Sequence, residues 1–199
     1  SNSSVYCWGA GNTGENGDGT TNHRNSPVKV SLPSDTAINI FGSSKSFAAV
    51  LSDGRAFVWG DNSGSKLKYT TNQNDVKTPI QLSSLTNIKE VDFGHMHSVI
   101  LTTDGKVYTG GRVYSSTNIA GNTTFHAGIS GNWSYTNGPL LMDGDWQGRA
   151  IGVRAMQTNT FILLDNSSVV CIGSNSNGQC SSNGTSGGNQ ITPIIIPNL

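Results

Sequence analysis

The chain has 199 residues, of which only 12% are charged, and its formal net charge is zero. Neutralising several phosphates requires a basic face, so this balance argues against nucleic-acid binding. The longest aliphatic run, Ile194–Ile196, is far shorter than the ~20 residues of a membrane-spanning helix, which argues against membrane insertion. The chain opens with Ser1 rather than Met, and we therefore expect a processed or excised piece.

Short apolar strands that end in glycine recur through the chain, and their glycines lie 51, 50 and 63 residues apart. In chain order these strands are Val5–Gly9, Phe57–Gly60, Val107–Gly110 and Val170–Gly173. A proline that enters an apolar strand recurs with them, at Pro27, Pro79, Pro139 and Pro193. A period near ~50 residues with several short strands per repeat is typical of a β-propeller, in which each repeat supplies about one blade.

A tight turn precedes each later glycine-ended strand, at Asp53-Gly54, Asp104-Gly105 and Asp165-Asn166. Asp-Gly between apolar strands is a strong hairpin signal because both central residues need a positive φ, and Asn166 is a tolerant replacement for glycine. The strands before these turns are apolar on both faces, which indicates burial between stacked sheets. The sequence predicts an all-β propeller with mainly four-stranded antiparallel blades. Its repeats span approximately residues 3–53, 54–104, 105–165 and, in part, 166–199, about three and a half to four blades in one segment.

Two motifs in register carry a resemblance to a known family. Residues Trp8–Gly19 read Trp-Gly-Ala-Gly-Asn-Thr-Gly-Glu-Asn-Gly-Asp-Gly, and Val91–Ser98 read Val-Asp-Phe-Gly-His-Met-His-Ser. Both resemble the repeat of the regulator of chromosome condensation family. The third repeat departs from it, with Ala155 in place of glycine and Thr158-Asn159 in place of His-Ser. This erosion suggests a divergent, bacterial- or phage-like branch, to which the chromatin and nucleotide-exchange roles are not carried over.

The resemblance implies a ring of seven blades. The remaining blades then come from the same or a neighbouring chain, although closure by four blades alone stays open. In that family the histidine at the position of His97 is a hydrogen-bonding core residue, and we expect the same here rather than a metal site with His95.

Residues that could support catalysis do not form a recognisable set. No Gly-x-Ser-x-Gly nucleophile elbow is present, and no lysine follows the glycine-rich run at 11–19 as a phosphate loop requires. The sequence therefore predicts no catalytic residues, no metal and no cofactor, and a protein that is not an enzyme. The three cysteines are Cys7, Cys171 and Cys180. They are expected to be small apolar side chains near the core, or else Cys171 and Cys180 form a disulfide.

The segment from Gly111 to Gln147 is an enlarged inter-strand loop of the third repeat and is rich in aromatic residues. Insertions within repeats map to loops on one face, often the binding face. We expect binding residues among Tyr114, Phe125, His126, Trp133, Tyr135 and Trp146. Aromatic side chains are good anchors in recognition surfaces, but some of these could instead fill gaps between blades.

The predicted function is a non-enzymatic binding or structural module that contacts a protein partner or a cell-surface glycan through ring-face loops. Low charge with abundant Asn, Ser, Thr and Gly resembles bacterial surface proteins and phage appendages, so we expect an extracellular, cell-surface or virion setting. The alternatives are a cytoplasmic regulator of a small GTPase, of the guanine nucleotide exchange type, and a propeller-type inhibitor of an enzyme.

Overall fold

Short antiparallel strands make up almost all of the regular structure. The computed structural model describes residues 3–43, 45–68, 72–82, 85–117, 123–127, 133–135, 139–142, 146–181 and 189–196. Within these residues the single helical element is a 3-10 turn, η1 (Ser63–Ser65). No helix in this part of the chain is long and apolar enough to cross a membrane.

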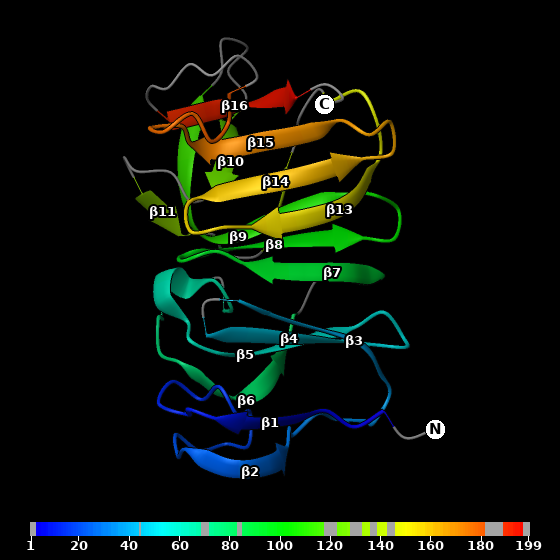
Figure 1. Ribbon diagram of the computed structural model, residues 1–199, viewed down its shortest axis with the longest axis vertical. Helices are drawn as coiled ribbons and strands as arrows, with labels where there is room; N and C mark the ends of the chain where they lie inside the picture. The colour runs from blue at the N-terminus through cyan, green and yellow to red at the C-terminus, as the bar shows by residue number, and fades with distance from the viewer. Residues whose placement is uncertain are drawn as a thin grey trace.

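Four sheets follow one another along the chain (Figure 1). The first contains β1 (Tyr6–Gly9) and β2 (Arg24–Lys29), and the second contains β3 (Ala37–Ser43), β4 (Ser46–Leu51), β5 (Ala56–Gly60) and β6 (Val76–Gln81). The third is built on β7 (Ile88–Phe93), β8 (His97–Thr102), β9 (Val107–Thr117) and β12 (Leu140–Leu141). The fourth contains β13 (Ala150–Ala155), β14 (Asn159–Leu164), β15 (Val169–Ser174) and β16 (Asn189–Ile196). The expected all-β fold with four-stranded antiparallel blades is confirmed.

Each of the first three sequence repeats straddles two sheets. The stretch 3–53 supplies β1 and β2 to the first sheet, and then β3 and β4 to the second. The first sheet has only two strands among the described residues, both equivalent to the outer pair of the later sheets. Three complete blades and one outer half are therefore present.

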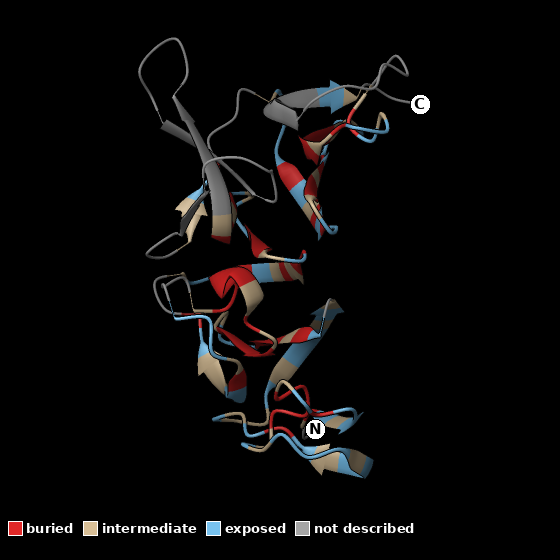
Figure 2. Ribbon diagram, turned by 90° about the vertical axis from the view of Figure 1, so that its left-hand side faces the viewer, coloured by how far each residue is buried: buried red, intermediate tan, exposed pale blue. Residues whose placement is uncertain are grey.

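Buried residues gather where the sheets face one another (Figure 2), and most of them are apolar. One buried cluster joins the first three sheets and includes Val5, Val30, Val58, Trp59 and Val91. A second joins the third and fourth sheets and is built on Val99, Leu101, Val153, Ile162 and Val170. All residues of β8 are buried because a sheet covers each of its faces, as its two-sided apolar pattern predicted.

Side chains of β7, the inner strand of the third sheet, accept hydrogen bonds from the backbone of β13 in the fourth sheet. Glu90 Oε2 accepts a hydrogen bond from the Val153 N–H at 3.3 Å, and Asp92 Oδ2 accepts one from the Ala155 N–H at 3.0 Å. Burial raises the pKa of Asp92. Two carboxylates on β7 thereby satisfy donors of β13 that face no neighbouring strand.

Two details of the sequence prediction were wrong. In the predicted Asp-Gly turns only Gly54 and Gly105 have a positive φ, and in the third turn Ser167 rather than Asn166 holds that conformation. In the third sheet Gly111, not Gly110, pairs with the first residue of β8 as Gly60 does with that of β4. Pattern alone could not fix these registers because each alternative lies one residue away.

Candidate binding surfaces

The enlarged segment of the third repeat extends the sheet rather than forming a free loop. Beyond the blade, β9 pairs on one side with β10 (Thr123–Ala127) and on the other with β11 (Trp133–Tyr135). Tyr114 lies opposite His126 in one pairing and opposite Trp133 in the other. Phe125 lies opposite Ser115, and Tyr135 lies opposite Arg112. Five of the six expected binding residues thus belong to one small three-stranded unit.

The sixth expected residue, Trp146, lies apart from this unit. It is half-buried and packs against the second core cluster, which includes Met142 and Val170. Substituting it would therefore disturb packing between the third and fourth sheets. This placement corresponds to the packing alternative that the sequence left open for each aromatic residue.

The two neighbouring histidines have different surroundings. His95 is exposed, whereas His97 is fully buried, with Nε2 3.2 Å from Thr160 Oγ1 on the fourth sheet. Burial, reinforced by the nearby charge of Lys66, lowers the pKa of His97 to about 4. His97 is therefore a neutral core residue between two sheets. Among the described residues no three His, Cys, Asp or Glu side chains gather to hold a metal ion.

A buried ion pair joins the second and third sheets. Lys66 Nζ lies 2.7 Å from Asp61 Oδ2 and donates to the His95 carbonyl at 3.1 Å. Burial lowers the pKa of Lys66, although the Asp61 carboxylate opposes that change. Burial would raise the pKa of Asp61, but hydrogen bonds from Lys66 and Ser63 outweigh it and the pKa is lowered. Both side chains act as a fixed link rather than as reactive groups.

Cys171 and Cys180 form a disulfide with a Cα–Cα distance of 5.2 Å, which settles the alternative that the sequence left open. Cys171 has the same place in its strand register as Val58. Cys180 is equivalent to Leu67, since each donates its N–H to the Oδ1 atom of an asparagine five residues earlier. Val58 and Leu67 lie in the first core cluster. Cys7 has a free thiol and is half-buried, and burial raises its pKa.

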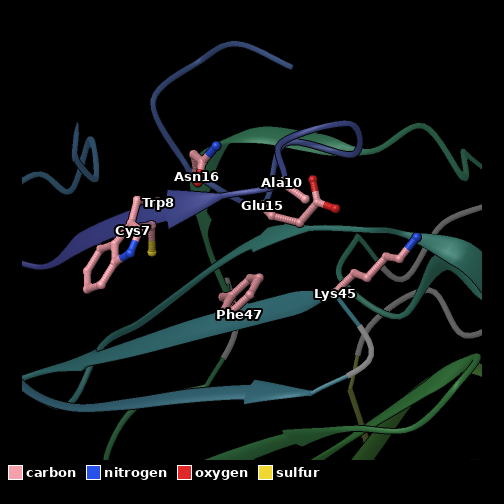
Figure 3. A pocket seen from close by; sticks show the side chains of 7 residues that line it. All are labelled: Cys7, Trp8, Ala10, Glu15, Asn16, Lys45 and Phe47. Atoms are coloured by element: carbon pink, nitrogen blue, oxygen red, sulfur yellow. The ribbon is translucent and has the colours of Figure 1, made fainter. Parts of the chain in front are cut away.

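A hollow of about 480 Å³ opens between β1 and β4 (Figure 3). Its lining includes Trp8, which is 63% exposed, and Phe47, which stacks on the buried Trp59 with ring centroids 6.0 Å apart. A second hollow of about 330 Å³ lies further along β1, beside the exposed Tyr6, Ile38 and Ile40. The sequence reasoning treated Trp8 as a repeat residue and did not find this surface. Among the described residues β2 is the only strand that pairs with β1, and the repeat pattern gives no signal of this.

Comparison with known proteins agrees with this architecture. The model of the regulator of chromosome condensation (RCC1) repeat matches residues 2–50 and 53–101. An RCC1 repeat-containing protein of Dictyostelium discoideum is 28% identical over 181 residues, which is 88% of this chain and 37% of that protein.

Solved structures show the same fold over nearly the whole chain. Human WBSCR16 superposes with a TM-score of 0.78 at 19% identity, covering 99% of this chain and 49% of that one. Prp20p of Saccharomyces cerevisiae, studied for its binding to Gsp1p and histones, gives a TM-score of 0.74 at 17% identity over 98% of this chain and 46% of its own. The chain therefore spans about half of these propellers.

Proposed function

The chain belongs to the RCC1-repeat family of β-propellers, and we propose that it is a non-catalytic module that binds a protein partner. The observation that carries this proposal is the three-stranded unit of β9, β10 and β11, in which His126, Tyr114 and Trp133 follow one another across the strands. Aromatic residues on a firm scaffold provide contact area with little loss of side-chain entropy. We assign the binding role to Tyr114, Phe125, His126, Trp133 and Tyr135.

A protein partner is favoured by the similarity to Prp20p, whose studied partners, Gsp1p and histones, are proteins. The same similarity supports the narrower alternative of a small-GTPase regulator. The sheet extension beyond the blade supports the inhibitor alternative, because such an element can enter the active site of an enzyme.

We also infer that further blades complete the ring and come from the same or a neighbouring chain. The chain spans about half of the solved propellers that it resembles. Among the residues that the structure describes, its first sheet has two strands where the complete sheets have at least four. These two observations support a larger assembly without identifying the polypeptide that supplies it.

The setting that we propose is extracellular, at a cell surface or in a virion, where a glycan partner is an additional possibility. The low share of charged residues supports it, and so does the Cys171–Cys180 disulfide, since disulfides persist mainly in oxidising compartments. The names of the similar proteins give this setting no support.

The test is capture of a partner by the immobilised chain from the extracellular and cytosolic fractions of the organism that makes it. We expect a protein that the native chain retains and that Trp133→Ala and Tyr135→Ala lose. Met156→Ala is the control, because Met156 is a large apolar residue that is 60% exposed, lies between β13 and β14 and lines neither hollow beside β1. Retention that survives both substitutions would remove the extension from the proposal.

Two parallel assays separate the alternatives. Binding on a glycan array that depends on Trp133 would favour the glycan partner. Accelerated release of labelled GDP from a captured GTPase would favour the exchange regulator, and inhibition of a captured enzyme would favour the inhibitor.

A further inference from the structure

The disulfide of the fourth sheet closes a loop whose shape recurs in two other repeats. In each copy a residue with positive φ donates its N–H to the carbonyl of the residue three positions earlier. The donor and acceptor pairs are Gly14 and Gly11, Ser65 and Asn62, and Gly178 and Asn175, with N···O distances of 2.9, 2.9 and 3.1 Å. The first two copies of this turn form without a covalent link.

The second repeat holds its loop by apolar packing at the place where the fourth repeat has sulfur. Leu67 and Cys180 each donate their N–H to an asparagine Oδ1 atom at 2.9 Å, and both side chains are buried. The fourth sheet therefore has contacts that keep its loop in place after the disulfide is opened. Two thiols fill less volume than the Val58 and Leu67 side chains, so the reduced loop is held more weakly than its equivalent.

Each sulfur of the disulfide has a polar neighbour that suits the reduced state. Cys171 Sγ lies 3.7 Å from the Gln179 carbonyl oxygen, an acceptor that a thiol can use and a disulfide sulfur cannot. Asn159 Nδ2 donates to Cys180 Sγ at 3.3 Å. A donor beside a sulfur favours the thiolate, whereas an acceptor favours the protonated thiol. The two cysteines are thus placed for different protonation states once they are reduced.

The loop is the part of this site that meets solvent. Ser176, Asn177 and Gln179 are exposed, whereas Cys171 and Cys180 are fully buried. Reduction therefore requires the loop to open, and a reductant that enters in this way reaches Cys180, the sulfur on the loop, first.

We propose that Cys171–Cys180 is a redox switch, which a dithiol reductant opens and which frees residues 175–181 while the fourth sheet stays folded. First, a thiolate of the dithiol bonds to Cys180 Sγ, and the electron pair of the broken S–S bond goes to Cys171 Sγ. Cys171 takes up a proton and donates it to the Gln179 carbonyl as a hydrogen bond. The second thiol of the reductant then loses its proton and attacks its own bound sulfur. Cys180 leaves as a thiolate beside Asn159, and the reductant ends as a cyclic disulfide.

The place of the loop connects this switch with the proposed function, on which this connection rests. β10 of the three-stranded extension lies beside β15, the strand that carries Cys171 and leads into the loop (Figure 1). Freeing the loop therefore loosens the support of β10. An oxidising compartment locks the extension against the fourth sheet, and a reducing compartment loosens it.

The test is hydrogen exchange of the intact chain, measured by mass spectrometry before and after treatment with dithiothreitol, a dithiol. We expect the amides of residues 175–181 to exchange about tenfold faster or more in the reduced chain, while those of β14 and β15 stay protected. β10 should gain more exchange than β11, which pairs with the other side of β9.

Three outcomes of this experiment would contradict the proposal. Loss of protection throughout β14 and β15 would mean that the disulfide is needed for the fold alone. Unchanged exchange of residues 175–181 would mean that the bond does not restrain the loop. Equal changes in β10 and β11 would remove the connection with the extension.

The double variant Cys171→Val/Cys180→Leu is the matched control. It gives the fourth repeat the apolar pair that Val58 and Leu67 form in the second repeat, so the loop should be held by packing. We expect its exchange to be the same with and without dithiothreitol. A response as large as that of the native chain would show that the reductant acts elsewhere.

Alkylation of the reduced chain tests the unequal protonation of the two sulfurs. At neutral pH we expect iodoacetamide to label Cys180 about tenfold faster or more than Cys171. Asn159→Asp replaces the donor beside Cys180 by a carboxylate and should slow its labelling by about fivefold or more. Equal labelling of the two cysteines, or a Cys180 rate that Asn159→Asp leaves unchanged, would overturn the assignment. None of these measurements involves a partner, so failure of the switch is distinct from failure of partner capture through Trp133.

Discussion

Two tryptophans at equivalent positions of two repeats have opposite surroundings. Trp59 is 1% exposed, donates its Nε1 hydrogen to the Glu15 carbonyl and stacks on Phe47, whereas Trp8 is 63% exposed. Their local sequences are alike, since Phe57-Val58-Trp59-Gly60 matches Tyr6-Cys7-Trp8-Gly9 in type and register. The difference comes from neighbours, because the first sheet covers Trp59 and no described element covers Trp8. A repeat motif thus encodes a strand, and the adjacent repeat decides whether that strand becomes core.

The largest expected effect comes from replacing each tryptophan by alanine. Trp59→Ala removes a large buried ring and its hydrogen bond, so we expect it to lower the free energy of unfolding by about 3–5 kcal/mol. Trp8→Ala should change it by less than about 0.5 kcal/mol, the usual range for exposed sites. Urea unfolding of the two variants beside the native chain measures both values. Similar losses for the two variants would refute the comparison.

The equivalent pairs Val58–Leu67 and Cys171–Cys180 allow a second comparison between repeats. Replacing both cysteines by alanine should cost about 2–3 kcal/mol, as expected for a disulfide that closes a loop of roughly ten residues. Leu67→Ala should cost about 2–5 kcal/mol, since Leu67 is fully buried. Unfolding of the native chain with and without reductant checks the first value. The Leu67→Ala variant keeps the Cys171–Cys180 disulfide, so reductant should lower its free energy of unfolding by the same amount as that of the native chain.

The equivalent glycines should also differ. Alanine at Gly60 adds left-handed strain and a Cβ 2.2 Å from the Lys45 carbonyl oxygen, whereas alanine at Gly9 adds only the strain. We expect Gly60→Ala to be more destabilising than Gly9→Ala by about 2 kcal/mol. Thermal and urea unfolding of the two variants test this order, and equal effects would mean that the close carbonyl is unimportant.

The smallest expected effect is a pH dependence that belongs to the later sheets alone. His97 has a folded pKa of about 4, below its ordinary value of 6.5, because the buried ring resists protonation. The unfolded chain therefore binds more protons between these values, and stability falls as the pH drops from 6.5 toward 4. Between pH 7 and pH 5.5 we expect a loss of about 1 kcal/mol, which His97→Gln should reduce. A native chain as stable at pH 5.5 as at pH 7 would contradict this.

The blade architecture could be predicted from the sequence because glycine, proline and apolar runs recur with one period. Register within the turns could not, since Asn166 and Ser167 are both plausible there and differ only by one position. The sequence placed Tyr114, His126 and Trp133 in one insertion but did not predict that they lie on paired strands. The other repeats lack this insertion, so their pattern could not indicate its strand pairing. The Trp8 surface was missed because composition does not reveal which copy of a repeat lacks a neighbour.

The carboxylates of Glu90 and Asp92 have a consequence for solubility. Exposed strand edges template unwanted pairing, and proteins block them with inward-pointing charges. β13 is blocked in this way at Val153 and Ala155, whereas the edge of β1 has no such guard among the described residues. Aggregation of the isolated chain should therefore start at its first sheet and not at the inner edge of its last, which makes Tyr6 and Trp8 the positions where a lysine would best keep it in solution.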